Sequence, residues 1–92
     1  MLTRKVTLGG TLPFTALRAA RLARAATSFS ARLVLQDARG TFNAKSTLGL
    51  LSLGSLSGRV MTLLAEGPDE QAAMDTLVLL LEAQEEETPG LS

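Results

Sequence analysis

Two kinds of apolar pattern alternate along these 92 residues, and their order is the feature that most constrains the fold. In one kind, apolar side chains occupy every second position, as at Leu33 and Leu35, which is typical of a strand with one buried face. In the other kind they recur three or four positions apart, as at Leu22 and Ala26, which is typical of an amphipathic helix. With the glycine and proline signals between them, these patterns predict strands at 2–8, 32–36, 41–43 and 59–65 and helices at 15–28, 46–54 and 67–83.

The predicted order of elements, β-α-β-β-α-β-α, indicates an α+β fold. Short strands in this order suit an antiparallel sheet with the helices on one face and the other face open to water. Three phenylalanines, with no tryptophan or tyrosine, mean that the core is mostly aliphatic. We expect one domain at residues 1–84 and a flexible acidic tail at residues 85–92.

The spacing of apolar residues also predicts which side of each helix faces the sheet. In the first helix the expected core stripe is Ala19, Leu22, Ala23 and Ala26, and the expected basic ridge is Arg18, Arg21 and Arg24. In the last helix the expected core face is Ala73, Leu77 and Leu80. Three further apolar residues widen that face, either through additional burial or as a self-association surface: Val78, Leu79 and Leu81.

The absence of histidine and cysteine narrows the chemistry available to the chain. Without an imidazole there is no histidine general base, no histidine metal ligand and no phosphohistidine. Without a thiol there is no disulfide and no thiolate metal site. We therefore expect no enzyme, no metal and no cofactor. No apolar run is long enough to span a bilayer and no signal-peptide pattern is present, which predicts a cytoplasmic protein without membrane contact.

Positive and negative charges are segregated along the chain, although they sum to zero. All nine basic residues lie at or before Arg59, and eight of the nine acidic residues lie at or after Glu66, with Asp37 as the exception. A basic half can mark a nucleic-acid surface, but no aromatic residues interleave with the arginines and no excess positive charge drives binding. Mutual neutralisation of a basic and an acidic helix is favoured instead, and no direct contact with nucleic acid is expected.

The stretch from Asn43 to Arg59 carries the candidate functional site. Ser46 is predicted to be the N-cap of the short helix, where free backbone N–H groups and the helix dipole would also favour a phosphate on its hydroxyl. The leucines of this helix fall on two faces, a buried one with Leu50 and Leu53 and another, beside the cap, with Leu48 and Leu51. Two interpretations follow: a docking surface under charge control, or a short core helix with an ordinary cap.

This stretch, the length and the order of elements together resemble HPr, the histidine-containing phosphocarrier family of the bacterial sugar phosphotransferase system. The most specific part is Lys45-Ser46-x-Leu-Gly-Leu-Leu-Ser-Leu-Gly, which is similar to the family's regulatory serine signature. Supporting matches are Ala26-x-x-Phe29, Gly58 and Gly67-x-Asp-Glu, so the resemblance covers nearly the whole chain. It implies the family's open-faced β-sandwich, a four-stranded antiparallel sheet covered on one face by three helices.

The chain departs from the family at the start of the first helix, where HPr carries Gly-x-His-Ala-Arg-Pro-Ala. Here Thr15 stands in place of the phosphoryl-accepting histidine, and Leu17 in place of the arginine that steadies the phosphoryl group. Arg18 is one position away, on a different side of the helix, and is not expected to substitute. A threonine phosphate is an ester of low transfer potential, and no base activates its hydroxyl.

We therefore predict no catalytic residue and no phosphoryl carriage. Thr15 is interpreted as the N-cap of the first helix, with a phosphothreonine as the other interpretation.

The resemblance implies a regulatory role. In the family, an HPr kinase/phosphorylase modifies the serine that corresponds to Ser46, and the modified protein binds a catabolite-control transcription factor. A known HPr-like branch has lost the histidine and kept this serine. We expect a monomer or weak homodimer whose partner surface is Phe14, Thr15, Thr47, Leu48 and Leu51. The alternatives are a phosphocarrier that receives phosphate from phosphoenolpyruvate through enzyme I, and an HPr-derived interaction module outside the sugar system.

Overall fold

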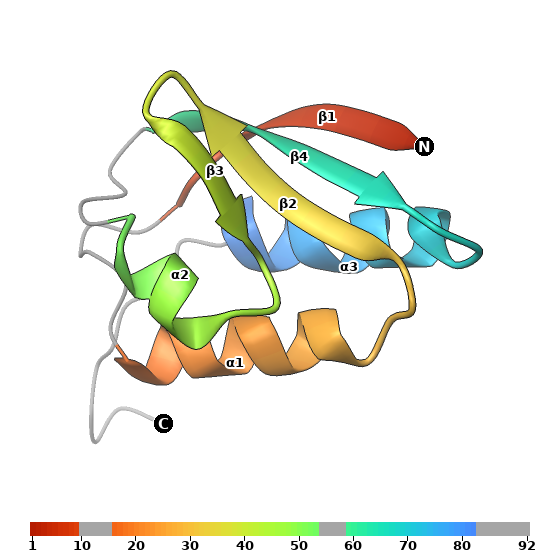
Figure 1. Cartoon of the computed structure of the whole chain (residues 1–92), viewed down its shortest axis with the longest axis horizontal. Helices are drawn as coiled ribbons and strands as arrows, with labels where there is room; N and C mark the ends of the chain where they lie inside the picture. The colour runs from red at the N-terminus through yellow and green to blue at the C-terminus, as the bar shows by residue number, and fades with distance from the viewer. Residues whose placement is uncertain (10–15, 54–58, 83–92) are drawn as a thin grey trace.

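Four short strands form one antiparallel sheet, and the helices all pack on the same face of it (Figure 1). The computed structural model describes residues 1–9, 16–53 and 59–82. Its elements are β1 (Leu2–Thr7), α1 (Ala16–Thr27), β2 (Arg32–Asp37), β3 (Gly40–Asn43), α2 (Thr47–Leu51), β4 (Val60–Glu66) and α3 (Glu70–Glu82). The sheet order is β1-β4-β2-β3. The predicted α+β fold and its order of elements are confirmed, whereas the predicted tail at residues 85–92 lies outside the described residues.

The sheet buries one face because the strands alternate as the sequence predicts. In the pairing of β2 with β4, Leu33 lies opposite Ala65 and Leu35 lies opposite Leu63. Each of these four side chains is at most 1 % exposed. A shift of β2 by one residue would turn Leu33 and Leu35 toward the open face, so the alternation fixes the register of the central strands.

α1 lies close to the rest of the core because its inner side is mostly alanine. Leu22 is buried together with three alanines of the predicted stripe, Ala19, Ala23 and Ala26. The stripe predicted from the spacing is therefore confirmed. Arg18, which was predicted to lie on the exposed ridge, is only 6 % exposed and belongs to the buried side.

Leu81, rather than the predicted Leu80, completes the buried stripe of α3. Leu80 is half-buried, and Leu79 is 75 % exposed. Met74 and Val78 are also buried, and they shift the centre of the stripe toward Leu81, because each residue turns the helix by about 100°. Most of the additional apolar surface of α3 is thus buried, and Leu79 alone of the three residues considered for self-association stays exposed.

The segment that starts α3 also ties this helix to the chain that leaves α1. Asp69 uses both carboxylate oxygens: Oδ2 accepts a hydrogen bond from the Ser30 amide and Oδ1 accepts one from the Ala31 amide, each at 2.8 Å. Glu70 Oε1 accepts from the Gly67 amide at 3.0 Å. The hydrogen bond from the Ser30 amide is the largest cause that holds the pKa of Asp69 below its ordinary value of 3.8, and the one from Ala31 acts in the same direction.

Replacing this carboxylate in the variant Asp69→Asn is expected to destabilise the protein at neutral pH and to matter progressively less in acid. Because the folded pKa is lowered, the contribution of the carboxylate is complete above its unfolded pKa and is lost as the pH falls through the folded value. Urea unfolding of both proteins from neutral pH down to about pH 3 measures this convergence. Asp75→Asn, on the exposed side of α3, is the matched control. A stability difference that stays constant over the whole range would contradict the prediction.

Candidate functional site

Ser46 occupies the N-cap of α2, as the sequence predicts. Its backbone is extended, with φ −109° and ψ 117°, and its Oγ accepts a hydrogen bond from the Gly49 amide at 3.0 Å. The preceding turn forms locally, since Asn43 accepts from the Lys45 amide through Oδ1 and from the Ser46 amide through its carbonyl oxygen. Ser46 remains partly exposed, so the cap does not bury it in the core.

The apolar surface beside Ser46 is narrower than the sequence suggests. Leu48 is 80 % exposed, whereas the two leucines predicted for the core are buried. Leu51, predicted to lie on the exposed face, is half-buried and packs against the core. Thr47 is half-buried as well. Leu48 therefore supplies most of the exposed apolar surface that α2 offers.

A second exposed apolar side chain lies at the start of α1, which packs against α2. Leu17 is 58 % exposed. From the sequence this residue was singled out only because it replaces an arginine. Phe14 and Thr15, predicted as partner-binding residues and Thr15 also as a cap, lie outside the described residues.

The guanidinium group of Arg18 points inward, toward the last turn of α3. Nη1 donates to the Gly9 carbonyl oxygen at 2.8 Å, and Nη2 donates to the carbonyl oxygens of Leu81 at 3.3 Å and Leu80 at 3.4 Å. These terminal carbonyls carry the negative end of the helix dipole, which favours a cation there. Arg18 is therefore part of the internal structure and is not a surface arginine next to residue 15.

Lys45 is likewise engaged with the backbone. Its Nζ donates to the Phe29 carbonyl oxygen at 2.8 Å, just beyond the end of α1. This contact joins the turn before Ser46 to the exit of α1. Lys45 thus stabilises the position of the turn.

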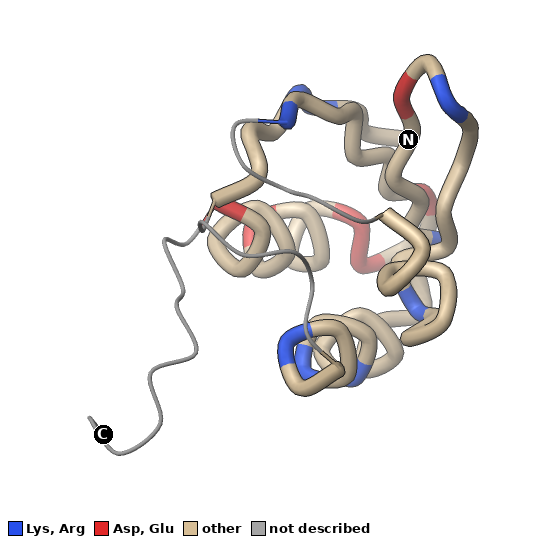
Figure 2. Tube along the Cα trace, turned by 90° about the vertical axis from the view of Figure 1, so that its left-hand side faces the viewer, with Lys and Arg blue, Asp and Glu red and all other residues tan. Residues whose placement is uncertain are grey.

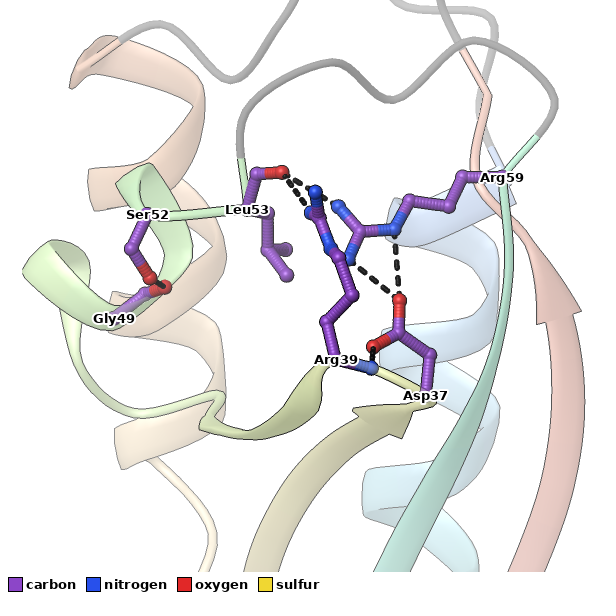
Figure 3. A network of polar contacts seen from close by, with 6 residues as sticks. All are labelled: Asp37, Arg39, Gly49, Ser52, Leu53 and Arg59. Atoms are coloured by element: carbon purple, nitrogen blue, oxygen red, sulfur yellow. Dashed lines mark hydrogen bonds and ion pairs between the residues drawn. The ribbon is translucent and has the colours of Figure 1, made fainter.

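A cluster of polar contacts closes the other end of α2 (Figure 3). Arg39 Nη2 donates to the Leu53 carbonyl oxygen at 2.8 Å, and Arg59 Nη1 donates to the same oxygen. Asp37 Oδ2 accepts from both Nε and Nη2 of Arg59, while Oδ1 accepts from the Arg39 amide at 2.9 Å. The hydrogen bond from Arg59 is the main reason that the pKa of Asp37 lies below its ordinary value. We call Asp37, Arg39, Arg59 and the Leu53 carbonyl the Leu53 clamp.

The sequence alone did not predict the clamp, and Asp37 and Arg39 fall between the strands expected at 32–36 and 41–43. The available signal was the position of Asp37, the one acidic residue within the basic half of the chain. A lone carboxylate among arginines is a candidate for pairing, but the sequence does not indicate which arginine approaches it.

The charged helices lie next to each other, which mutual neutralisation requires, and the neutralisation itself stays a prediction. Figure 2 shows basic residues along α1 and acidic residues along α3, and the two helices are in contact. Within residues 1–9, 16–53 and 59–82, no three histidine, cysteine or acidic residues gather so that they could hold a metal ion. Of the helices that the structure describes, none is long and apolar enough to cross a membrane.

Comparison with known proteins matches residues 2–83 to a family model described as the PTS HPr component phosphorylation site. The phosphocarrier protein NPr of Shewanella violacea is 36 % identical over 86 residues, which cover 94 % of each chain. The crystal structure of HPr-C-His from Thermoanaerobacter tengcongensis superposes with a TM-score of 0.83 at 34 % identity, over 94 % of this chain and 99 % of that one.

A structure of the catabolite repression containing protein Crh of Bacillus subtilis, described as a domain-swapped, intertwined dimer, also matches. Its TM-score is 0.71 at 32 % identity, over 92 % of this chain and 100 % of that one. The similarity thus extends over sequence and fold together, and includes both phosphocarriers and a Crh protein.

Proposed function

This chain belongs to the HPr family, and on that premise we propose that it is a regulatory member, phosphorylated on Ser46, rather than a phosphoryl carrier. Proteins of this family are phosphocarriers rather than enzymes. The observation that carries the proposal is the contrast between the two family sites in this chain. Ser46, at the position that the resemblance assigns to the regulatory serine, is a partly exposed N-cap, whereas Thr15 stands at the position that the resemblance assigns to the phosphoryl-accepting histidine.

The chemistry of the replaced site argues against phosphoryl carriage. The chain contains no histidine, so no phosphorylated imidazole of high transfer potential can form. Leu17 occupies the position of the arginine that steadies the phosphoryl group in the family. Arg18 does not compensate, because its guanidinium is buried against the carbonyl oxygens of Gly9 and the end of α3.

The surroundings of Ser46 support a modification and docking site. The hydroxyl oxygen accepts from Gly49, and Leu48 offers an exposed apolar side chain two residues further on. We propose an HPr kinase/phosphorylase as the modifying enzyme and a catabolite-control transcription factor as the reader, both in the cytoplasm. Thr47, Leu48 and Leu51 are the proposed contacts on α2, and Phe14 and Thr15 are proposed as further contacts. The free protein is proposed to be a monomer or a weak homodimer.

Incubation with HPr kinase/phosphorylase and ATP is expected to add one phosphate, on Ser46, because this residue stays partly exposed. Intact-mass measurement and peptide mapping detect the group. Ser46→Ala is expected to abolish it, at a cost of about 1 kcal/mol in stability from the lost cap. Ser52→Ala is the matched control, because Ser52 is exposed at the end of the same helix and donates to the Gly49 carbonyl instead.

Two results would contradict the proposal. One is the absence of phosphate on the folded wild-type protein, and the other is a phosphate that persists in Ser46→Ala. A parallel incubation with phosphoenolpyruvate and enzyme I tests the second candidate, a phosphocarrier, which the name of the NPr relative favours. No label is expected by that route.

A further inference from the structure

α2 is too short to hold its own position. It has five residues, well below the length at which an isolated helix is stable in water. Leu50 and Leu53 bury their side chains in the core, which fixes one side of the helix. The carbonyl oxygens at the end of α2 are satisfied locally, since Leu48 accepts from the Ser52 amide, Leu50 from the Leu53 amide and Gly49 from the Ser52 hydroxyl. The placement of the helix, with Ser46 at its start, therefore depends on what holds the chain where it leaves α2.

The Leu53 clamp holds the chain two residues beyond Leu51, with donors from two separate parts of the chain. Arg39 comes from the turn between β2 and β3, and Arg59 comes from the residue just before β4. Arg59 has little freedom of its own, because three of its nitrogens are engaged and its guanidinium lies 6.0 Å from the centroid of the Phe42 ring. The side chains of Arg59 and Asp37 are each only 15 % exposed.

Asp37 makes the approach of two cations to one oxygen favourable. Two guanidinium groups at the same carbonyl repel each other unless a negative charge lies beside them. The carboxylate of Asp37 accepts from the side chain of Arg59 and from the backbone of Arg39, so it orients both donors as well as compensating their charge. Arg59 reaches Asp37 Oδ2 through Nε and Nη2 and the Leu53 carbonyl through Nη1, which requires the several nitrogens of the arginine fork, whereas lysine has one.

We propose that Arg59, oriented by Asp37, is a positioning residue for Ser46: it holds the end of α2 and thereby keeps the first turn of that helix in the geometry that a modifying enzyme meets. The inference rests on the proposed function of Ser46 for its enzymatic consequence. The structural part of the inference rests only on the contacts of the Leu53 clamp. The contact of Arg59 at Leu53 lies at the opposite end of α2 from the cap, and the five residues of that helix span about 7.5 Å at about 1.5 Å per residue.

Amide hydrogen exchange tests the structural part without any enzyme. The Gly49 amide, which donates to Ser46 Oγ, reports on the first turn of α2. In Arg59→Gln its exchange is expected to accelerate at least about fivefold, the effect of one lost hydrogen bond. Arg59→Lys is expected to behave alike, because one ammonium group cannot reach both Asp37 and Leu53. Arg32→Gln, which removes a 71 % exposed arginine side chain, is the matched control and should leave Gly49 unchanged.

Kinetics with HPr kinase/phosphorylase test the enzymatic part. In Arg59→Gln, kcat/KM for Ser46 is expected to fall at least about fivefold, because Ser46 and Leu48 are no longer held in one orientation. Val78→Ala, a cavity variant in α3, controls for a general loss of stability and should be phosphorylated at the wild-type rate while it stays folded.

The outcomes separate this inference from the proposed function. Unchanged exchange of the Gly49 amide in Arg59→Gln would contradict the proposed role of the Leu53 clamp. So would wild-type values of Gly49 exchange and of kcat/KM in Arg59→Lys. Accelerated exchange with an unmodified wild-type protein would support the clamp and contradict the proposed function. Accelerated exchange with unchanged phosphorylation would overturn the positioning role of Arg59.

Discussion

Replacing Gly67 by alanine is expected to lower the free energy of unfolding by about 3–5 kcal/mol, from overpacking and backbone strain together. Gly67 has a φ of +154°, and a Cβ added there would lie 2.6 Å from the Cα atom of Ala31. That neighbour is backbone, so a simple change of rotamer cannot relieve the contact. A shift of Ala31 would also disturb the hydrogen bond that its amide donates to Asp69. Urea unfolding of Gly67→Ala measures the loss.

The control for this variant is Gly40→Ala. Gly40 also has a positive φ, +144°, but a Cβ added there would meet nothing within 4 Å. Only backbone strain remains, and we expect a loss of about 1–2 kcal/mol. The difference between the two losses of stability measures the effect of the close approach between Gly67, which follows β4, and Ala31. Equal losses would show that this approach has no energetic consequence.

Removing the donors of Arg18 is expected to have the second-largest effect. Arg18→Met keeps an unbranched side chain of comparable length but leaves the Gly9 carbonyl without this donor in a buried position. Leu80 and Leu81 lose a cation at the end of α3 at the same time, although Leu81 still accepts from the Gly9 amide. A loss of about 2–4 kcal/mol follows from the cost of an unsatisfied buried acceptor and the lost charge-assisted contacts.

Arg24→Met is the comparison for Arg18→Met, because Arg24 is exposed on the same helix. Its loss is expected to stay within about 0.5 kcal/mol, as for most surface substitutions. Equal, small losses for the two variants in urea unfolding would mean that Arg18 has no structural role. In that case its guanidinium would be available to a bound group, and the argument against phosphoryl carriage would weaken.

The parts of this structure that the sequence predicts are those that depend on near neighbours in the chain. The alternation in β2 and β4 determines which side chains face the helices. Ser46 is recognisable as a cap because its partner, the Gly49 amide, is three residues away.

The errors arise where a distant part of the chain decides the outcome. Arg18 lies four positions before Leu22, and this spacing predicts a place on the buried side of the helix. Its charge, in contrast, predicts an exposed position. The carbonyl oxygens at the end of α3, more than sixty residues away, allow the buried position. Asp37 and Arg59 are similarly 22 residues apart, and no local pattern joins them. Leu81 is buried rather than Leu80, because the full set of buried residues on α3 determines where the centre of the buried stripe lies.

The strand order has a consequence for how the protein is made. β4 lies between β1 and β2, so the first strand to leave the ribosome pairs only with the last one to be synthesised. Until β4 is available, the hairpin of β2 and β3 is the only strand pairing that the described chain can form. β1 therefore stays unpaired until β4 has been synthesised. Closing the long loop between these two strands is the step expected to set the folding rate.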